Sequence, residues 1–443
     1  MLGVLLIVLS LGLLMYLAYR GMSILWISIL CAGILGILSG LPITSSGDVK
    51  GILTIFGEGF GGFAGSYMLI FLTGAIFGKL MEVSGAAKAV GKLIVEKLGA
   101  KNAIAAVIIS AGVLCYGGVS LFVVVFAIYP LALSLFREAN ITRRLIPASI
   151  AAGAFTFSMT ALPGTPQIQN IIPMEYFGTT AMAAPVIGIV CGMVMMFGAI
   201  FYLNSKERKY RANGEVFDEP TGKAAAEEGD DDVPNPWLSL VPLLLVLVTL
   251  NIGNFIPSIN ITVEIALLIG IVFILVVFYS RIQGKIIETM NSGAAGSIMA
   301  LGNTAAAVGF GSMVKAVPGF TVLKDMILGL DGAVLASEAI AVTTLAGATG
   351  SASGGLGIAL SALGEQYLAL GQAAGIDPQV LHRVASIACG GLDSLPHCGA
   401  VLTLLAITGM NHKKSYFDIF IVTVAIPLVA TVLAVILGTV GVV

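Results

Sequence analysis

Residues 146–167 read IPASIAAGAFTFSMTALPGTPQ, and residues 383–399 read RVASIACGGLDSLPHCG. Each stretch begins as an apolar helix of small residues and then reaches glycine, hydroxyl side chains and proline. Proline removes a helical hydrogen bond and disfavours helical geometry in the residue before it. We therefore expect both helices to unwind, the first near Pro163 and the second near Pro396. The alternative is a pair of proline kinks in otherwise continuous helices, with the freed backbone groups bonded to nearby hydroxyls.

The composition of the chain predicts that most of its surface faces lipid. Of the 443 residues, 58% are hydrophobic and 10% are charged, and the mean hydropathy is +1.02. A globular domain averages about 25% charged residues. Apolar runs of roughly 20 residues, enough to cross a bilayer, include 2–19, 179–203, 237–255 and 416–440. Because backbone groups in hydrocarbon must pair internally, we predict an all-α polytopic membrane protein, and we expect the first run to be a retained helix.

The distribution of Lys and Arg predicts the topology, because these residues concentrate on the cytoplasmic side. With the N-terminus outside, 18 of the 22 basic residues fall on the cytoplasmic side, provided that two segments, 102–136 and 333–370, enter and leave by the same face. Each segment is then a helical hairpin with a glycine-rich tip. The basic residues left outside are Lys50, Lys315, Lys324 and Arg383.

Internal similarity predicts that the chain is an inverted repeat. The sequence ASIA occurs at 148–151 and again 237 residues later at 385–388, and the pair Gly117–Gly118 recurs as Gly354–Gly355. We expect each half to contain about five full spans, a helical hairpin and a broken helix. The predicted domains are an N-terminal membrane repeat (1–203), a cytoplasmic linker (204–236) and a C-terminal membrane repeat (237–443).

The hairpin tips and the broken helices are the predicted binding site. Open backbone in mid-membrane is tolerated where it lines a cavity, and matched broken helices in two halves mark a transporter's binding site. Glycines let backbone amides approach a ligand, and helix N-termini favour a carboxylate. The alternative is that the small residues only allow tight helix packing. The candidate substrate-binding residues are Gly117, Gly118, Ser120, Thr160, Gly164, Thr165, Gln167, Ser351, Ser353, Gly354 and Ser394.

Three ionisable residues in apolar segments are candidates for ion coupling. Asp393 and His397 lie four residues apart in the second interruption and can titrate as a coupled pair. Glu338 lies inside the second hairpin, where a structural role or a place near the outer interface is the alternative. We expect His382 and His412, which adjoin charged residues at helix ends, to lie at the surface.

The sequence offers little for enzymatic chemistry. No GxxxxGK[ST] phosphate-binding run is present, and Ser394 with His397 lacks the GxSxG turn of a serine hydrolase. The five cysteines are scattered in apolar segments without a CxxC pair, which favours buried thiols. We therefore predict no enzyme, no cofactor, no metal and no nucleic-acid partner.

Two short stretches resemble a known family. Residues 77–81 read FGKLM and are followed by Ser84, Gly85 and Ala86, while residues 349–352 read TGSA. Both resemble stretches of the gluconate:proton symporter (GntP) family of the ion transporter superfamily. The resemblance implies proton-coupled uptake of small hydroxy- or sugar-acid anions, a homodimer with a scaffold domain, and elevator-type movement of a transport domain.

The first interruption differs from that family's gluconate-type members, which carry His-Pro-Gly-Pro where this chain has Leu162-Pro163-Gly164-Thr165. The loss of the histidine argues against a polyol acid such as gluconate. The resemblance to family members of similar pattern implies 3-hydroxybutyrate, a shorter and less polar anion. We therefore expect a multi-pass transporter of the bacterial plasma membrane that imports a small hydroxy monocarboxylate, 3-hydroxybutyrate- or gluconate-like, with protons. The alternatives are a sodium-coupled carboxylate symporter and a facilitative channel.

Overall fold

The computed structural model describes residues 2–47, 49–220, 232–252, 256, 261–322, 334–396 and 398–443. Helices make up most of this part of the chain, and its only β-pairing is an isolated bridge between Ser46 and Val49. The predicted all-α fold is confirmed.

Long apolar helices cross much of the molecule. By length and composition, four described helices can span a membrane: α3 (Ile52–Val83), α9 (Pro185–Ala212), α13 (Ile286–Ala316) and the C-terminal run His412–Thr439. A fifth candidate joins α4 (Ala86–Leu98) to residues Ala100–Tyr116 through a bend of 100°. Shorter apolar helices accompany them, namely α1 (Leu2–Tyr19), α2 (Ile24–Leu38), α10 (Pro236–Asn251), α11 (Val263–Val277), α15 (Val334–Thr349) and α18 (Gly399–Thr408).

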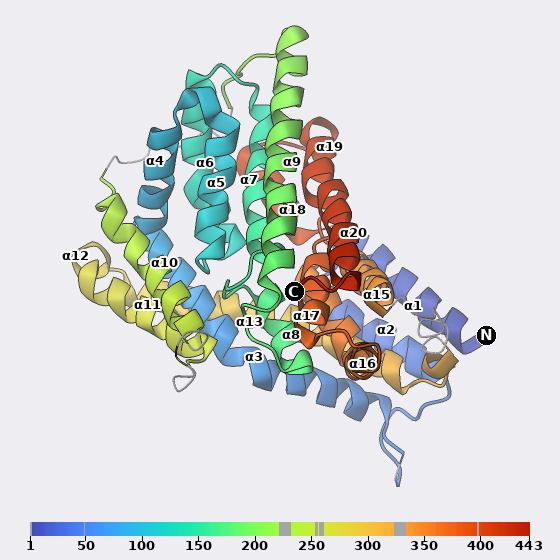
Figure 1. Ribbon diagram of the computed structural model, residues 1–443. Coiled ribbons are helices and arrows are strands. Elements are labelled where there is room, and N and C mark those ends of the chain that lie inside the picture. Colours follow the sequence, from blue (N-terminus) through green and yellow to red (C-terminus); the bar gives the residue numbers. More distant parts are fainter. Residues whose placement is uncertain are drawn as a thin grey trace.

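One group of helices, which we call the scaffold layer, comprises α1, α2, α3, α10, α11, α12 (Tyr279–Ile282) and α13. The long helices α3 and α13 pack together in opposite directions across the lower part of Figure 1. Glycines bring their backbones close, since a Cβ on Gly293 would lie 3.0 Å from the Cα of Ile76, and one on Gly59 would lie 3.1 Å from the Cα of Gly309.

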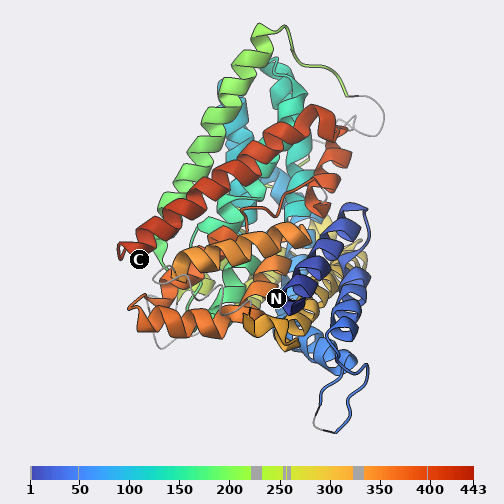
Figure 2. The same ribbon diagram turned by 90° about the vertical axis from the view of Figure 1, so that its right-hand side faces the viewer.

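A second group, the core group, contains a hairpin and an interrupted helix from each half of the chain (Figure 2). From the first half come α5 (Ala103–Tyr116), α6 (Leu121–Glu138), α7 (Ile146–Ala154), α8 (Ile168–Phe177) and α9. From the second come α15, α16 (Ala352–Ala373), α17 (Pro378–Ala388), α18, α19 (Phe417–Phe420) and α20 (Ile426–Thr439). The same order of elements thus occurs twice; the opposite orientation of the two halves in the membrane stays a prediction.

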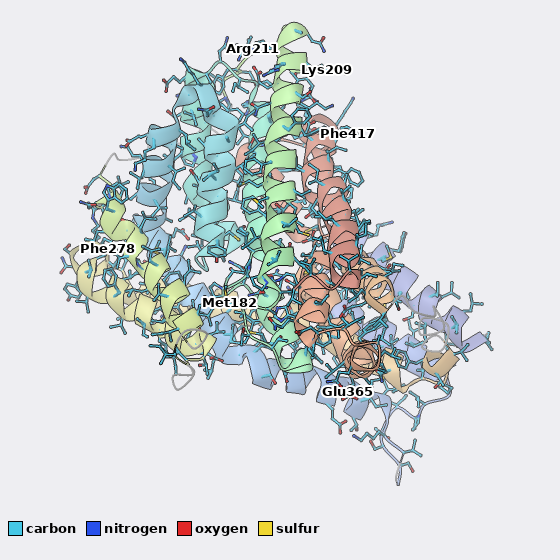
Figure 3. All side chains as sticks on the ribbon, in the orientation of Figure 1. Met182, Lys209, Arg211, Phe278, Glu365 and Phe417 are labelled. Atoms are coloured by element: carbon cyan, nitrogen blue, oxygen red, sulfur yellow. The ribbon has the colours of Figure 1, made fainter. Side chains whose placement is uncertain are left out.

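The expected linker begins as a continuation of α9, which runs to Ala212. Beyond it, Asp218 pairs with Arg143 at 2.8 Å and Glu215 with Arg144 at 3.1 Å, and Asp232 pairs with Arg281 at 2.7 Å. Lys209 and Arg211 project from this end of α9, and Glu365 of α16 lies at the opposite end of the molecule (Figure 3). The division into repeats and a linker stays a prediction, with α9 crossing its first boundary.

Candidate functional site

The first interruption is an unwound segment between α7 and α8. The helix loosens into a π-helical turn over Phe157–Ala161 and then becomes extended at Leu162. Gly164 has φ +82°, a left-handed conformation open to glycine at little cost. The hydroxyl of Thr156 donates to the carbonyl of Ala152 at 2.6 Å, so local side chains satisfy backbone groups that the missing turns release. The break predicted around Pro163 is present.

The second interruption separates α17 from α18 and contains Asp393. The Asp393 side chain is 5% exposed, and its carboxyl accepts a hydrogen bond from the Ser394 hydroxyl at 2.9 Å. Tyr416 donates to the Ser394 carbonyl at 3.1 Å, and the exposed His412 contacts the Pro396 carbonyl at 3.0 Å through Nε2. The C-terminal run therefore fixes the shape of this segment. His397, the predicted partner of Asp393, lies outside the described residues.

The tip of the first hairpin packs on the first interruption. Gln167 donates its amide Nε2–H to the carbonyls of Cys115 at 2.6 Å and Val119 at 3.4 Å. Thr165 donates to the carbonyl of Tyr116 at 3.0 Å, and Tyr116 in turn donates its hydroxyl to the Pro163 carbonyl at 2.7 Å. These bonds bring together Thr165 and Gln167 with the tip that carries Gly117, Gly118 and Ser120.

The second hairpin packs on the second interruption through its first arm. Thr343 donates to the Ala388 carbonyl at 2.9 Å. A Cβ on Gly347 would lie 2.8 Å from the Cβ of Leu392, so the absence of a side chain allows the close approach. At the tip, Ser351 caps α16 by accepting the Gly354 N–H at 3.1 Å.

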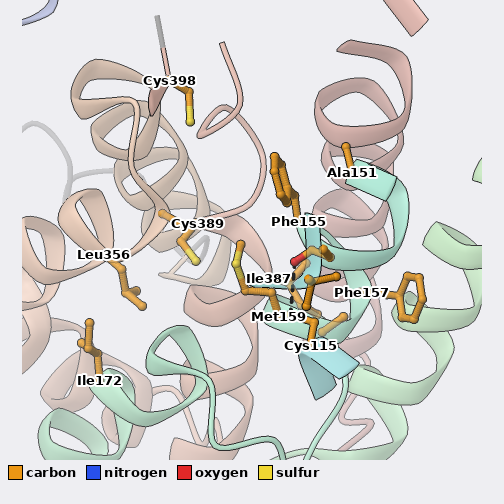
Figure 4. Packing of buried hydrophobic residues seen from close by; sticks show 14 of the residues in the cluster. Cys115, Ala151, Phe155, Phe157, Met159, Ile172, Leu356, Ile387, Cys389 and Cys398 are labelled. Atoms are coloured by element: carbon orange, nitrogen blue, oxygen red, sulfur yellow. Dashed lines mark hydrogen bonds between the residues drawn. The ribbon is translucent and has the colours of Figure 1, made fainter. Parts of the chain in front are cut away.

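The two interruptions touch each other. Ser386, near the end of α17, donates to the Thr160 carbonyl at 2.7 Å, and a Cβ on Gly390 would lie 3.2 Å from the Thr160 methyl. Figure 4 shows the packing around Met159 and Cys389, which flank this contact. The segments that the sequence singled out in each half therefore meet inside the protein.

Arg383 joins the halves at this point and was not among the predicted site residues. It is fully buried, and its guanidinium donates to the carbonyls of Ala161, Ala181 and Ala183 and to Oδ1 of Asn170 over 2.7–3.3 Å. Five bonds match the five N–H donors of an arginine. Although the charge count placed Arg383 at the outer face, it is a buried cation that holds the first interruption.

His382 extends the same network, so the expectation that it lies at the surface was wrong. It is fully buried, with Nδ1 2.6 Å from the Thr179 hydroxyl and Nε2 3.2 Å from Oδ1 of Asn170. Asn170 also donates to the carbonyls of Thr165 and Ala181, both at 2.9 Å. A sequence signal for this burial exists. His382 and Arg383 lie four and five residues after Pro378, inside α17, a helix with one apolar face.

Glu338 is buried away from the tips. It is 0% exposed, and neither carboxyl oxygen has a hydrogen-bond partner among the described residues. Thr349, at the tip, follows eleven residues later, about 16 Å along α15 at about 1.5 Å per residue. The role of Glu338 in ion coupling stays a prediction.

Several other predicted residues make contacts within the protein. Gly117 lies against Leu243 of α10, where a Cβ would be 2.6 Å from Cδ2, and Thr160 donates its hydroxyl to the Thr156 carbonyl at 3.1 Å. Ser353 lies 3.4 Å from the Thr304 hydroxyl of the scaffold layer. Ser120 precedes α6, and its side chain makes no capping bond to a described residue. Substrate binding by these residues stays a prediction.

Comparison with known sequences gives a consistent family match. The family model for GntP family permeases matches residues 2–278, more than half of the chain. The uncharacterized transporter YxjC of Bacillus subtilis is 42% identical over 94% of this chain and 95% of its own. A gluconate permease of Bacillus licheniformis is 28% identical, over 36% of this chain and 33% of its own.

Solved structures of transporters share the fold. The YdaH transporter of Alcanivorax borkumensis superposes with a TM-score of 0.58 over 96% of this chain and 98% of its own, at 16% identity. MtrF of Neisseria gonorrhoeae, described as illuminating a class of antimetabolite efflux pumps, gives a TM-score of 0.51 over 93% and 94% of the two chains, at 15% identity.

Proposed function

Because this chain belongs to the GntP family of permeases, we propose that it is a secondary transporter that imports a small hydroxy monocarboxylate together with a proton. The observation that carries the proposal is the contact between the two interruptions, each packed against a hairpin. This arrangement gathers unwound backbone and four helix ends in the interior of a multi-pass membrane protein, where helix N-termini favour an anion.

Two buried carboxyl groups support the proton as the coupling ion. Asp393 is bonded to Ser394, Glu338 has no partner, and neither takes part in an ion pair within the described residues. An ionised carboxylate is costly to bury unpaired. Both groups are therefore suited to take up a proton in one state of the transport cycle and release it in another.

Gln167 supports proton coupling over sodium coupling. Unwound carbonyls near a hairpin tip are where a transporter would ligate sodium. Here the carbonyls of Cys115 and Val119 accept from the Gln167 amide, and that of Tyr116 accepts from the Thr165 hydroxyl. Side-chain donors thus compete with a sodium ion for these oxygens at the first tip.

The test is uptake of labelled 3-hydroxybutyrate into proteoliposomes that contain the purified chain. An inward proton gradient in sodium-free buffer should drive accumulation above the equilibrium level, and a sodium gradient at equal pH should not. Accumulation driven by sodium alone would establish the sodium symporter. Flux that merely equilibrates under both gradients would establish a facilitative pathway, and no flux would remove this substrate class.

The role of the carboxyl groups is tested by Asp393→Asn and Glu338→Gln. We expect each variant to lose most of its proton-driven accumulation, because an amide cannot carry the proton. Asp377→Asn is the matched control: Asp377 caps α17 by accepting the Gln379 N–H at 2.8 Å, and asparagine caps helices equally well. Unaltered accumulation in either buried variant would remove that residue from the coupling mechanism.

A further inference from the structure

Helices α8 and α16 lie side by side and run in the same direction. Tyr176 of α8 packs on Gly364 of α16, where a Cβ would lie 3.0 Å from Cδ1 of the ring. One turn earlier on α8, Ile172 faces Leu356, which is also earlier on α16 (Figure 4). Both helices therefore begin at the same end of the pair, α8 in the first interruption and α16 at the tip of the second hairpin.

Gln169 lies where the two helices begin, and its amide oxygen is a hydrogen-bond acceptor without a donor among the described residues. It is the second residue of α8 and is 6% exposed, and its Oε1 is buried without a hydrogen-bond partner among the described residues. Gln169 precedes Tyr176 by two turns, so both lie on the side of α8 that faces α16. Because helical side chains lean toward the N-terminus, the Gln169 amide is directed to the place where the two helices begin.

The groups at this place are complementary to a hydroxy acid. Two parallel helix N-termini supply partial positive charge and backbone donors for a carboxylate. The amide oxygen of Gln169 can only accept a hydrogen bond. A carboxylate has no proton to donate to it, whereas a hydroxyl group on the same ligand has one.

We propose that Gln169 recognises the hydroxyl group of the transported acid while the N-termini of α8 and α16 hold its carboxylate. This inference rests on the proposed function and adds a specificity-determining residue to it. A buried acceptor left without a donor is costly, so the site should discriminate against the acid that lacks the hydroxyl. The discrimination should be roughly tenfold or more, the size expected for one unsatisfied buried acceptor.

The test compares binding of 3-hydroxybutyrate and butyrate to the purified full-length chain by calorimetry. The wild type should bind 3-hydroxybutyrate more tightly. Gln169→Met, which keeps the length but removes the acceptor, should weaken 3-hydroxybutyrate to the level of butyrate and leave butyrate unchanged. Gln366→Leu is the matched control. The Oε1 of Gln366 is also buried without a partner in the part of the chain that the structure describes, but it lies about 20 Å along α16 from the start of that helix.

Each result decides between the two claims. Saturable binding of 3-hydroxybutyrate with the same preference over butyrate in Gln169→Met overturns the role of Gln169 and leaves the proposed function standing. Binding of neither acid to the wild type overturns both. If the variant does not fold, the wild type provides a second measurement: a single fixed acceptor should favour one enantiomer of 3-hydroxybutyrate, and equal affinity for both enantiomers contradicts the proposal.

Discussion

At the scale of single residues, the molecule depends on buried polar groups whose partners come from the other half of the chain. Arg383 of α17 bonds to Ala161, Ala181 and Ala183 of the first half, and Asn170 accepts from both Arg383 and His382. Such a network stabilises a single arrangement when every member is satisfied and is costly when one member is lost.

Arg383→Lys should destabilise the protein by about 3 kcal/mol or more, because hydrogen bonds to charged groups contribute about 1.5–3 kcal/mol each and a lysine has only three donors. The measurement is the midpoint of thermal unfolding in detergent. As a control, Arg137→Lys retains an exposed ion pair with Glu219 and should change stability by less than about 1 kcal/mol. Equal midpoints for both variants would contradict a structural role for the guanidinium.

At the scale of elements, the second hairpin is held together by contact between the backbones of its arms. Gly355 of α16 lies directly on Ala346 of α15, and a Cβ at this position would overlap the Ala346 backbone. The tip next to it turns through Gly350, whose φ is +59°. The hairpin therefore depends on a residue without a side chain at the crossing.

Gly355→Ala should force the arms apart and destabilise the protein by about 1–3 kcal/mol, the usual range for overpacking. Proton-driven uptake should fall with it, because the first arm positions the second interruption. Gly296→Ala in α13 is the control: no described residue lies within 4 Å of its Cβ position, and alanine in a helix interior should stabilise by up to about 1 kcal/mol. A Gly355 variant as stable as the wild type would show that the arms can separate without loss.

These elements also show how far the sequence predicted the structure. Apolar runs, prolines and glycine pairs act on the backbone locally, so the hairpins and both interruptions could be placed to within a few residues. The network of Asn170, His382 and Arg383 was missed. The apolar face of α17 indicates burial, but the hydrogen-bond partners of these side chains come from the other half of the chain. The unpaired oxygen of Gln169 required the neighbouring helix α16 as well.

At the scale of the whole molecule, basic residues are distributed unequally between the two ends. Lys209 and Arg211 lie at the far end of α9, and Arg143 and Arg144 pair with the acidic residues that follow this helix. The rule that basic residues stay in the cytoplasm predicts that this end faces inward and that the loop around Ser46 faces outward.

Cysteine labelling tests this orientation, since the five native cysteines are all buried. Ser46→Cys and Asn213→Cys each introduce an exposed thiol in a loop or at a helix end. In intact cells a membrane-impermeant maleimide should modify the first variant and reach the second only after permeabilisation. The reverse pattern would invert the topology.

The guanidinium of Arg383 also limits how this protein can move. A rocking motion that swung one half away from the other would strip five hydrogen bonds from a cation in a medium without water to replace them. We therefore expect α8 and α17 to travel as a single body through the cycle, and the sliding seam to lie where the core group meets the scaffold layer, along the contact of α16 with α13.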